Sequence, residues 1–355
     1  MSLLIKGAGI WKESSPSVRD SGIWKPVQNA YVKDAGVWKE YFSAGSYIPT
    51  PAPTPAIGAP FEGGFYSGMI WNELMQSSTS ATVGLNMVTK TFTVPDMDSN
   101  PMVYVGQALE VRSRANPEIR FRGVVTGAAG TSLEIYVNGT SGGGTFADWS
   151  IMARYRVIVA PKAGGENASA AWKNANTAGP AACGTLTEGR KATLAMVAAD
   201  TSTVYPAAHW CNALTIGGYT DWYLPARDEL ELLWRNLKPV TDANYTGADR
   251  PAAATPNYTN LGSYGGTEAT HGLNKNSDPA GAAYTGSIPA QTSVAAFRAG
   301  GTEALEFGAA YYWSSTEYSA PHAWLQVWGS SSPGTQISGN KGNPLRARAV
   351  RRSII

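Results

Sequence analysis

The sequence is poor in charge, cysteine and histidine. Charged residues make up 15% of the chain and the formal net charge is +2, so nothing favours nucleic acid or an anionic membrane as a partner. The two cysteines, Cys183 and Cys211, are too few for a disulfide framework and too far apart for a CxxC motif. We expect both to be reduced and buried. His209, His271 and His322 lack ligand spacing, so we expect no metal site and no cofactor.

Long apolar runs are also missing. No stretch approaches the roughly 20 apolar residues that a membrane-spanning helix needs, and the first residues lack the apolar core of a signal peptide. We therefore expect a soluble, unexported protein without membrane insertion. Glycine and aromatic residues are plentiful instead, with 39 Gly, 12 Trp and 17 Tyr in 355 residues. This balance favours loop-rich β structure, and the length allows two or three domains.

A short pattern occurs three times near the N-terminus, at residues 5–12, 18–25 and 32–39. Each copy predicts a strand, a glycine turn and a Trp-bearing strand. A lone hairpin is at best marginally stable, so the copies need one another or a partner. A self-contained β module and a docking or trimerising module both meet this need. The repeat resembles Val-Lys-Asp-x-Gly-Val-Trp-Lys units of phage tail proteins, which implies that residues 1–42 dock onto the virion.

Proline alternates along the next segment, residues 43–60, at Pro49, Pro51, Pro53 and Pro55. Proline fixes φ and removes an amide donor, so this segment should be extended and unpaired. We interpret it as a spacer between the N-terminal module and the rest of the chain.

Two apolar phrases, residues 63–71 and 155–162, look like one hairpin whose strands are far apart in sequence. Residues 77–152 between them alternate in a strand pattern, which predicts an inserted β domain. Asp96 and Asp98 flank a turn beside Pro95 and suit backbone hydrogen bonding better than catalysis. The insert resembles an accessory β module of phage tail fibres. We expect strands at 91–94, 109–112, 119–125 and 133–137, with turns at Thr126-Gly127 and Asn138-Gly139.

Helical periodicity begins after residue 168. It predicts helices over residues 170–174, 190–199, 207–214 and 225–237. In the last of these, the acidic residues Asp228, Glu229 and Glu231 are expected on a solvated face. Residues 240–308 show no sustained period, which is typical of long functional loops.

Three phrases in order carry a resemblance. They are residues 210–230, 312–317 and 346–352. Together they resemble the C-type-lectin-like variable proteins of diversity-generating retroelements and related phage tail-fibre proteins of the major-tropism-determinant type. The resemblance covers residues 61–76 and 153–355 and implies an α+β fold with paired N- and C-terminal strands. It also implies that Trp222, Leu224, Trp313 and Trp324 are core residues.

The resemblance further implies a displayed ligand-binding surface within residues 318–343. In the family, fixed framework residues alternate with positions that vary from copy to copy. Strand alternation independently places Leu325 and Val327 opposite Trp324, so we expect both to be exposed. The implied framework is Ala323, Trp324, Gln326, Trp328, Gln336 and Lys341. The implied ligand-binding residues are Tyr318, Ser319, Ala320, His322, Leu325, Val327, Gly329, Ser330, Thr335, Ile337, Ser338, Gly339, Asn340, Gly342 and Asn343.

These features predict a phage tail receptor-binding protein that recognises a host cell-surface receptor, either protein or glycan, without catalysis. The partners would be phage tail or baseplate proteins, in a homotrimer made in the bacterial cytoplasm and mounted on the virion. Two alternatives remain. A tail-associated glycan-degrading enzyme needs two carboxylates across a cleft, and a bacterial surface adhesin needs an export signal; the sequence offers neither.

Overall fold

The chain forms two compact units, residues 1–51 and 52–355. A computed structural model describes strand residues between 4 and 43, then residues 54–84, 88–95, 103–246, 272–330 and 332–355. We describe the two units separately.

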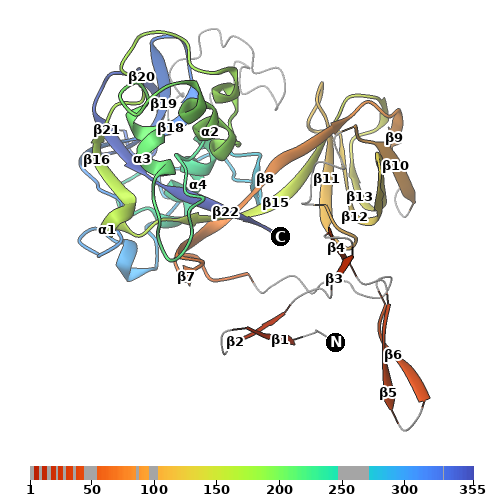
Figure 1. Cartoon of the computed structure of the whole chain (residues 1–355). Coiled ribbons are helices and arrows are strands. Elements are labelled where there is room, and N and C mark those ends of the chain that lie inside the picture. Colours follow the sequence, from red (N-terminus) through yellow and green to blue (C-terminus); the bar gives the residue numbers. More distant parts are fainter. Residues whose placement is uncertain are drawn as a thin grey trace. The chain divides into compact units, whose positions relative to one another are not determined.

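The first unit consists of three antiparallel hairpins, one for each copy of the sequence repeat (Figure 1). Each hairpin is a sheet of two strands, and among the strand residues that the structure describes no hairpin pairs with another. The predicted strands are therefore confirmed. The strands are β1 (Leu4–Gly7), β2 (Ile10–Glu13), β3 (Ser17–Asp20), β4 (Ile23–Pro26), β5 (Asn29–Asp34) and β6 (Val37–Ser43).

The second unit is organised by two long strands, β8 (Gly64–Ser77) and β15 (Trp149–Val159). They pair antiparallel from Ser77 opposite Trp149 to Phe65 opposite Val159. This confirms the predicted pairing of two segments far apart in sequence. The remaining strands of their sheet are β7 (Pro60–Phe61), β10 (Thr89–Thr93), β11 (Ala108–Ser113), β12 (Arg120–Ala129), β13 (Ser132–Ser141), β17 (Ser277–Asp278) and β22 (Val350–Ile354).

The chain between β8 and β15 adds β10 to β13 to one side of the sheet (Figure 1). Near the two ends of this inserted segment, β9 (Ala81–Val83) and β14 (Gly144–Phe146) pair with each other. The apolar alternation places Phe92, Phe121 and Trp149 in one buried aromatic cluster. The ring centroids of Phe121 and Trp149 are 5.0 Å apart. The four expected strands are confirmed. Asp96 and Asp98 lie outside the described residues.

Both turns predicted in this insert are wrong. Thr126-Gly127 lies within β12 and Asn138-Gly139 within β13. The glycines instead accompany irregularities in the β12–β13 pairing, which shifts register between Arg122 and Gly123 and between Val125 and Gly127. Glycine within a strand commonly marks such a bulge.

Three expected helices are confirmed as α2 (Gly189–Ala199), α3 (Pro206–Asn212) and α4 (Arg227–Leu237). The helix expected at residues 170–174 is wrong, because that segment follows β16 (Glu166–Ala170), which pairs with β21 (Leu345–Arg348). The backbone N–H groups of Trp172 and Lys173 both donate to the Lys341 carbonyl. Tertiary hydrogen bonds thus override a weak local helix preference. The shorter elements are α1 (Lys162–Gly165), η2 (Ala181–Gly184) and η3 (Ala295–Phe297).

A second sheet has the order β16-β21-β18-β19-β20, with β18 (Ala309–Glu317), β19 (His322–Gly329) and β20 (Gln336–Asn340). The chain then leaves this sheet at Ala349, and β22 pairs with β15 in the larger sheet. The single closing strand expected over residues 345–351 is therefore two strands in two sheets. The expected pairing of the N- and C-terminal strands is wrong, because β22 pairs with β15, which lies between β22 and the N-terminal strand β8.

The core of the smaller sheet is rich in tryptophan. Trp222, Leu224, Trp313 and Trp324 are all buried, as expected. Cys183 and Cys211 are free and buried, also as expected. Residues 44–53 of the expected spacer lie outside the described residues, and its last part is paired, because the Gly58 N–H donates to the Tyr66 carbonyl at 2.7 Å.

The described residues are mostly β-sheet with few helices, which fits an α+β or mainly-β class. Within the described ranges, no helix is both long enough and apolar enough to cross a membrane.

Candidate binding surface

The framework residues of the predicted surface are all buried. They lie on β19, β20 and the turn after β20. Those on β19 have side chains on both faces of the strand. Trp328 contacts Trp234 of α4 edge to face, with ring centroids 4.8 Å apart. The buried set is Ala323, Trp324, Gln326, Trp328, Gln336 and Lys341.

Four of the predicted ligand-binding residues are also buried, and the prediction that they are displayed is wrong. Leu325 is 4% exposed and Val327 is 2% exposed, because they pack in the core that contains Trp313 and Trp222. Thr335 and Gly329 are buried as well. β19 is a central strand between β18 and β20, and side chains cover both of its faces, so alternation does not expose either set.

The other predicted residues reach the surface. Ala320, Ser330, Asn340, Gly342 and Asn343 are exposed. The partly exposed residues are Tyr318, Ser319, His322, Ile337, Ser338 and Gly339.

All of these except Ser330 and Ile337 lie in or beside two adjoining turns. The N–H groups of Tyr318 and Ser319 donate to the His322 carbonyl at 3.0 Å, which closes the turn between β18 and β19. His322 is opposite Asn340 in the strand register, and the Lys341 N–H donates to the Pro321 carbonyl at 3.0 Å. We call residues 318–322 and 338–343 the corner. Ser330 follows the other end of β19.

A buried ammonium group supports the corner from below. Lys341 is fully buried, and its Nζ donates to the Ala320 carbonyl at 2.7 Å and to the Thr177 carbonyl at 3.1 Å. It also forms an ion pair with Glu317. Burial lowers the pKa of Lys341, and Glu317 opposes that shift. One side chain thus ties three loops together.

Glu317 was not singled out from the sequence. Its Oε1 also accepts from the Gly179 N–H at 2.7 Å, so it orients the loop before η2 as well as Lys341. The sequence signal for Glu317 was its place directly after the Trp313-Ser314-Ser315-Thr316 phrase. Its partner, Lys341, lies 24 residues further along the chain.

An aromatic stack limits how much of Tyr318 is displayed. Its ring meets Trp324 edge to face at 5.2 Å, and the guanidinium of Arg227 lies 4.3 Å from the Trp324 ring centre. The Arg227 Nε donates to Gln336 Oε1 at 2.8 Å. The stack connects the corner to the start of α4.

The acidic residues of α4 are buried, so their expected place on a solvated face is wrong. Asp228, Glu229 and Glu231 are at most 3% exposed. Burial raises the pKa of Asp228 to about 6 and that of Glu229 to about 7. α4 packs between β8, β18, β19 and the loop around Asn274, so nearly every side of the helix is covered.

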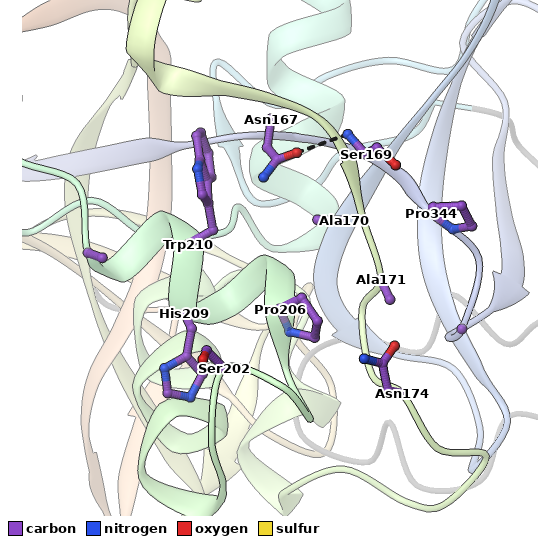
Figure 2. Close-up of a pocket in the computed structure, with 12 residues that line it drawn as sticks. Asn167, Ser169, Ala170, Ala171, Asn174, Ser202, Pro206, His209, Trp210 and Pro344 are labelled. Atoms are coloured by element: carbon purple, nitrogen blue, oxygen red, sulfur yellow. Dashed lines mark hydrogen bonds between the residues drawn. The ribbon is translucent and has the colours of Figure 1, made fainter.

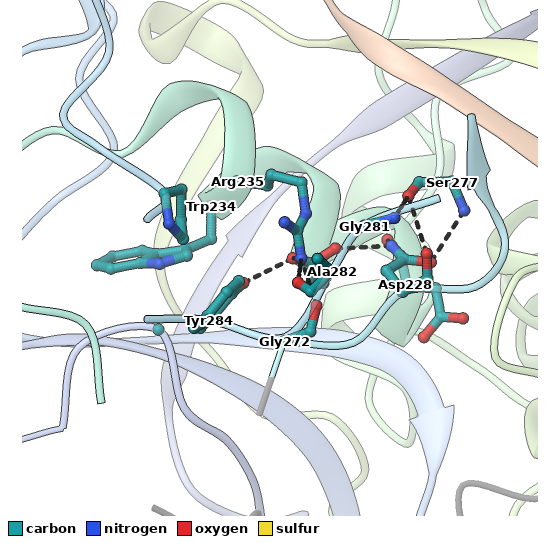
Figure 3. Close-up of polar contacts among 12 residues, drawn as sticks. Asp228, Trp234, Arg235, Gly272, Ser277, Gly281, Ala282 and Tyr284 are labelled. Carbon is teal, nitrogen blue, oxygen red and sulfur yellow. Dashed lines mark hydrogen bonds and ion pairs between the residues drawn. The ribbon is translucent and has the colours of Figure 1, made fainter. Parts of the chain in front are cut away.

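Side chains of the loop from Gly272 to Tyr284 donate hydrogen bonds to the carboxylates of Asp228 and Glu231 (Figure 3). Asn276 Nδ2 donates to Asp228 Oδ2 at 2.8 Å, and Asn274 Nδ2 donates to Glu231 Oε2 at 2.7 Å. Tyr284 donates its hydroxyl to Glu231 Oε1. The acids hold this loop against α4. Across the described residues, no group of three or more His, Cys, Asp or Glu side chains could hold a metal ion.

Comparisons with models of known protein families, with curated proteins and with solved structures found no match for this chain.

Proposed function

We propose that the chain is a phage tail receptor-binding protein whose residues 61–76 and 153–355 form a C-type-lectin-like domain. The corner contacts a host cell-surface receptor, and the chain acts by binding rather than catalysis. One observation carries the proposal: every framework position implied by the resemblance is buried, while most of the implied variable positions reach the surface in one place.

The way in which the corner is held in place favours a role in binding. A surface whose residues change needs a fold that does not depend on them. The corner turns are held by backbone hydrogen bonds, by Lys341 and by two side-chain contacts, from the Gly342 N–H to Asn340 Oδ1 and between Ser319 Oγ and His322 Nδ1. Ala320, Asn340 and Asn343 are exposed and contribute little burial. Substitution of exposed residues away from special features usually changes stability by no more than about 0.5 kcal/mol.

The test is a triple variant of the corner, His322→Ala/Asn340→Ala/Asn343→Ala, on the full chain assembled in the virion. Tyr318 is left in place because it packs on Trp324. We expect host adsorption to fall at least about thirtyfold, as when a contact worth about 2 kcal/mol is lost, with little change in the melting temperature of the purified protein.

The matched control is Arg190→Ala/Lys191→Ala/Thr302→Ala, three exposed residues that lie outside the corner and outside the predicted ligand-binding set. It should leave both adsorption and melting unchanged. Normal adsorption by the corner variant would contradict the proposal. Lost adsorption together with lost folding would show that these side chains stabilise the domain instead.

A further inference from the structure

A groove beside the corner opens between α3 and β16 together with the segment that follows β16 (Figure 2). Its volume is about 730 Å³, within the range of small-molecule sites. Gly342 of the corner and Pro344 lie on one wall, and α3 forms the other. The side chains that matter for recognition are Asn167, Ser169, Asn174, Ser202, His209 and Trp210.

Trp210 gives the groove a flat apolar surface. Its ring stands on α3 toward Asn167 (Figure 2) and is only partly buried, whereas Trp172, Trp222 and Trp313 nearby are fully buried. Its inner side packs on the core that contains Cys211. Pro206 and Pro344 extend the apolar lining.

The polar side chains are anchored and still have spare hydrogen-bonding capacity. Asn167 Oδ1 accepts from the Ser169 N–H at 2.9 Å, which leaves its amide hydrogens for a ligand. Asn174 Nδ2 donates to the Thr203 carbonyl at 2.6 Å, which leaves Oδ1 as an acceptor.

His209 supplies a second acceptor. Its Nε2 lies 2.7 Å from the Asp200 carbonyl oxygen. A carbonyl only accepts, so Nε2 carries a proton, and Nδ1 can accept a hydrogen bond when it carries none. The groove therefore offers amide donors, two acceptors and the hydroxyls of Ser169 and Ser202.

No Lys, Arg, Asp or Glu side chain lines the described part of the groove. An anionic or cationic ligand would lose hydration here without an opposite charge to replace it. A neutral sugar fits the chemistry better, because each hydroxyl both donates and accepts while the C–H face of the ring stacks on an indole.

We propose that this groove binds a short neutral oligosaccharide, with Trp210 as the stacking platform and Asn167, Asn174 and His209 as hydrogen-bonding partners. The site is separate from the corner except at Gly342. Its occupancy does not depend on the receptor proposal, because it is measured on purified protein rather than by adsorption.

The experiment measures binding of the full chain to a panel of short oligosaccharides of glucose, galactose, mannose and N-acetylglucosamine, with sialylated and sulfated sugars beside them. We expect at least one neutral sugar to bind and the charged ones to bind no better. Trp210→Ala should weaken that binding at least about tenfold, or 1.4 kcal/mol. Tyr104→Ala removes an exposed aromatic residue in the segment before β11, outside the groove, and should have no effect.

Asn167→Ala/Asn174→Ala provides a second test if Trp210→Ala fails to fold, and it should also weaken binding at least about tenfold. Absence of neutral-sugar binding, retention of full binding by both variants, or preference for charged sugars would each overturn the proposal. Preference for an extended peptide, which the edge strand β16 could pair with, would overturn it too. The corner variant should bind the sugar normally, so failure here and failure of the receptor proposal are distinguishable.

Discussion

At the scale of single residues, the most unusual group is Glu229. Its two carboxylate oxygens lie 2.7 Å from the Tyr223 hydroxyl and 2.8 Å from the Ala226 N–H, and the side chain is fully buried. Burial is the largest cause of its pKa near 7, and Arg352 opposes the shift. The residue therefore titrates near neutral pH inside the fold.

This pKa predicts that the protein is more stable in mild acid. Unfolded Glu229 has a pKa near 4.5 and folded Glu229 a pKa of about 7, so the folded state binds the proton more tightly. The resulting stabilisation is complete below the pKa of the unfolded state and is lost as pH rises through about 7. The free energy of unfolding falls over this window by up to about 1.4 kcal/mol per pH unit. Buried Asp228 shifts in the same direction.

Glu229→Gln should flatten this dependence, measured by denaturant unfolding between about pH 5 and about pH 8. The amide oxygen still accepts from Ala226, and the amide nitrogen donates to the Tyr223 hydroxyl. Glu306→Gln, at an exposed ion pair with Lys162, is the control and should leave the slope unchanged. An unchanged slope in Glu229→Gln would show that Glu229 stays ionised in the folded protein.

The residue identities correctly predicted which framework side chains are buried, but they gave the wrong exposure for Leu325 and Val327. The large framework residues are buried wherever the phrases place them, as Trp324 and Trp328 show. Leu325 and Val327 were expected outside because alternation assumes one solvated face. Whether a strand is central, and what covers its second face, depends on β18, β20 and the core beyond them, which local sequence does not reveal.

At the scale of elements, long periodic segments such as α4 and the β8–β15 pair were predictable, while short ones were not. The 170–174 segment has helix-forming residues but is held by Lys341 of a distant turn. The same Lys341 links three loops through its side chain. The corner therefore depends on one buried charge.

Lys341→Met should destabilise the domain by about 3–5 kcal/mol, because it removes a buried ammonium group that pairs with Glu317 and donates to the Ala320 and Thr177 carbonyls. Hydrogen exchange should show the largest loss of protection at Gly179 and in the corner turns. The double variant Lys341→Met/Glu317→Gln removes both charges and should recover much of the loss. If the double variant is as unstable as the single one, the ion pair is not what holds these loops.

At the scale of the whole molecule, the two units differ in how much they can bury alone. Residues 52–355 contain two large hydrophobic clusters and both multi-stranded sheets. The described strands of residues 1–51 form isolated two-stranded sheets, each with one repeat and one tryptophan, Trp11, Trp24 or Trp38. Isolated hairpins are marginal in water, so the first unit needs further copies or a partner.

We therefore predict that the full chain is a homotrimer through residues 1–51 and that residues 52–355 alone are a folded monomer. Light scattering of both forms at micromolar concentration measures the assembly, and thermal unfolding shows whether the shorter form keeps its core. Three corners on one particle would also raise avidity for a host surface, since linked sites bind at a high effective concentration. The shorter form should then bind host cells more weakly than the full chain while each corner binds equally well. A monomeric full chain would contradict this assignment, and a trimeric shorter form would move the assembly contacts into residues 52–355.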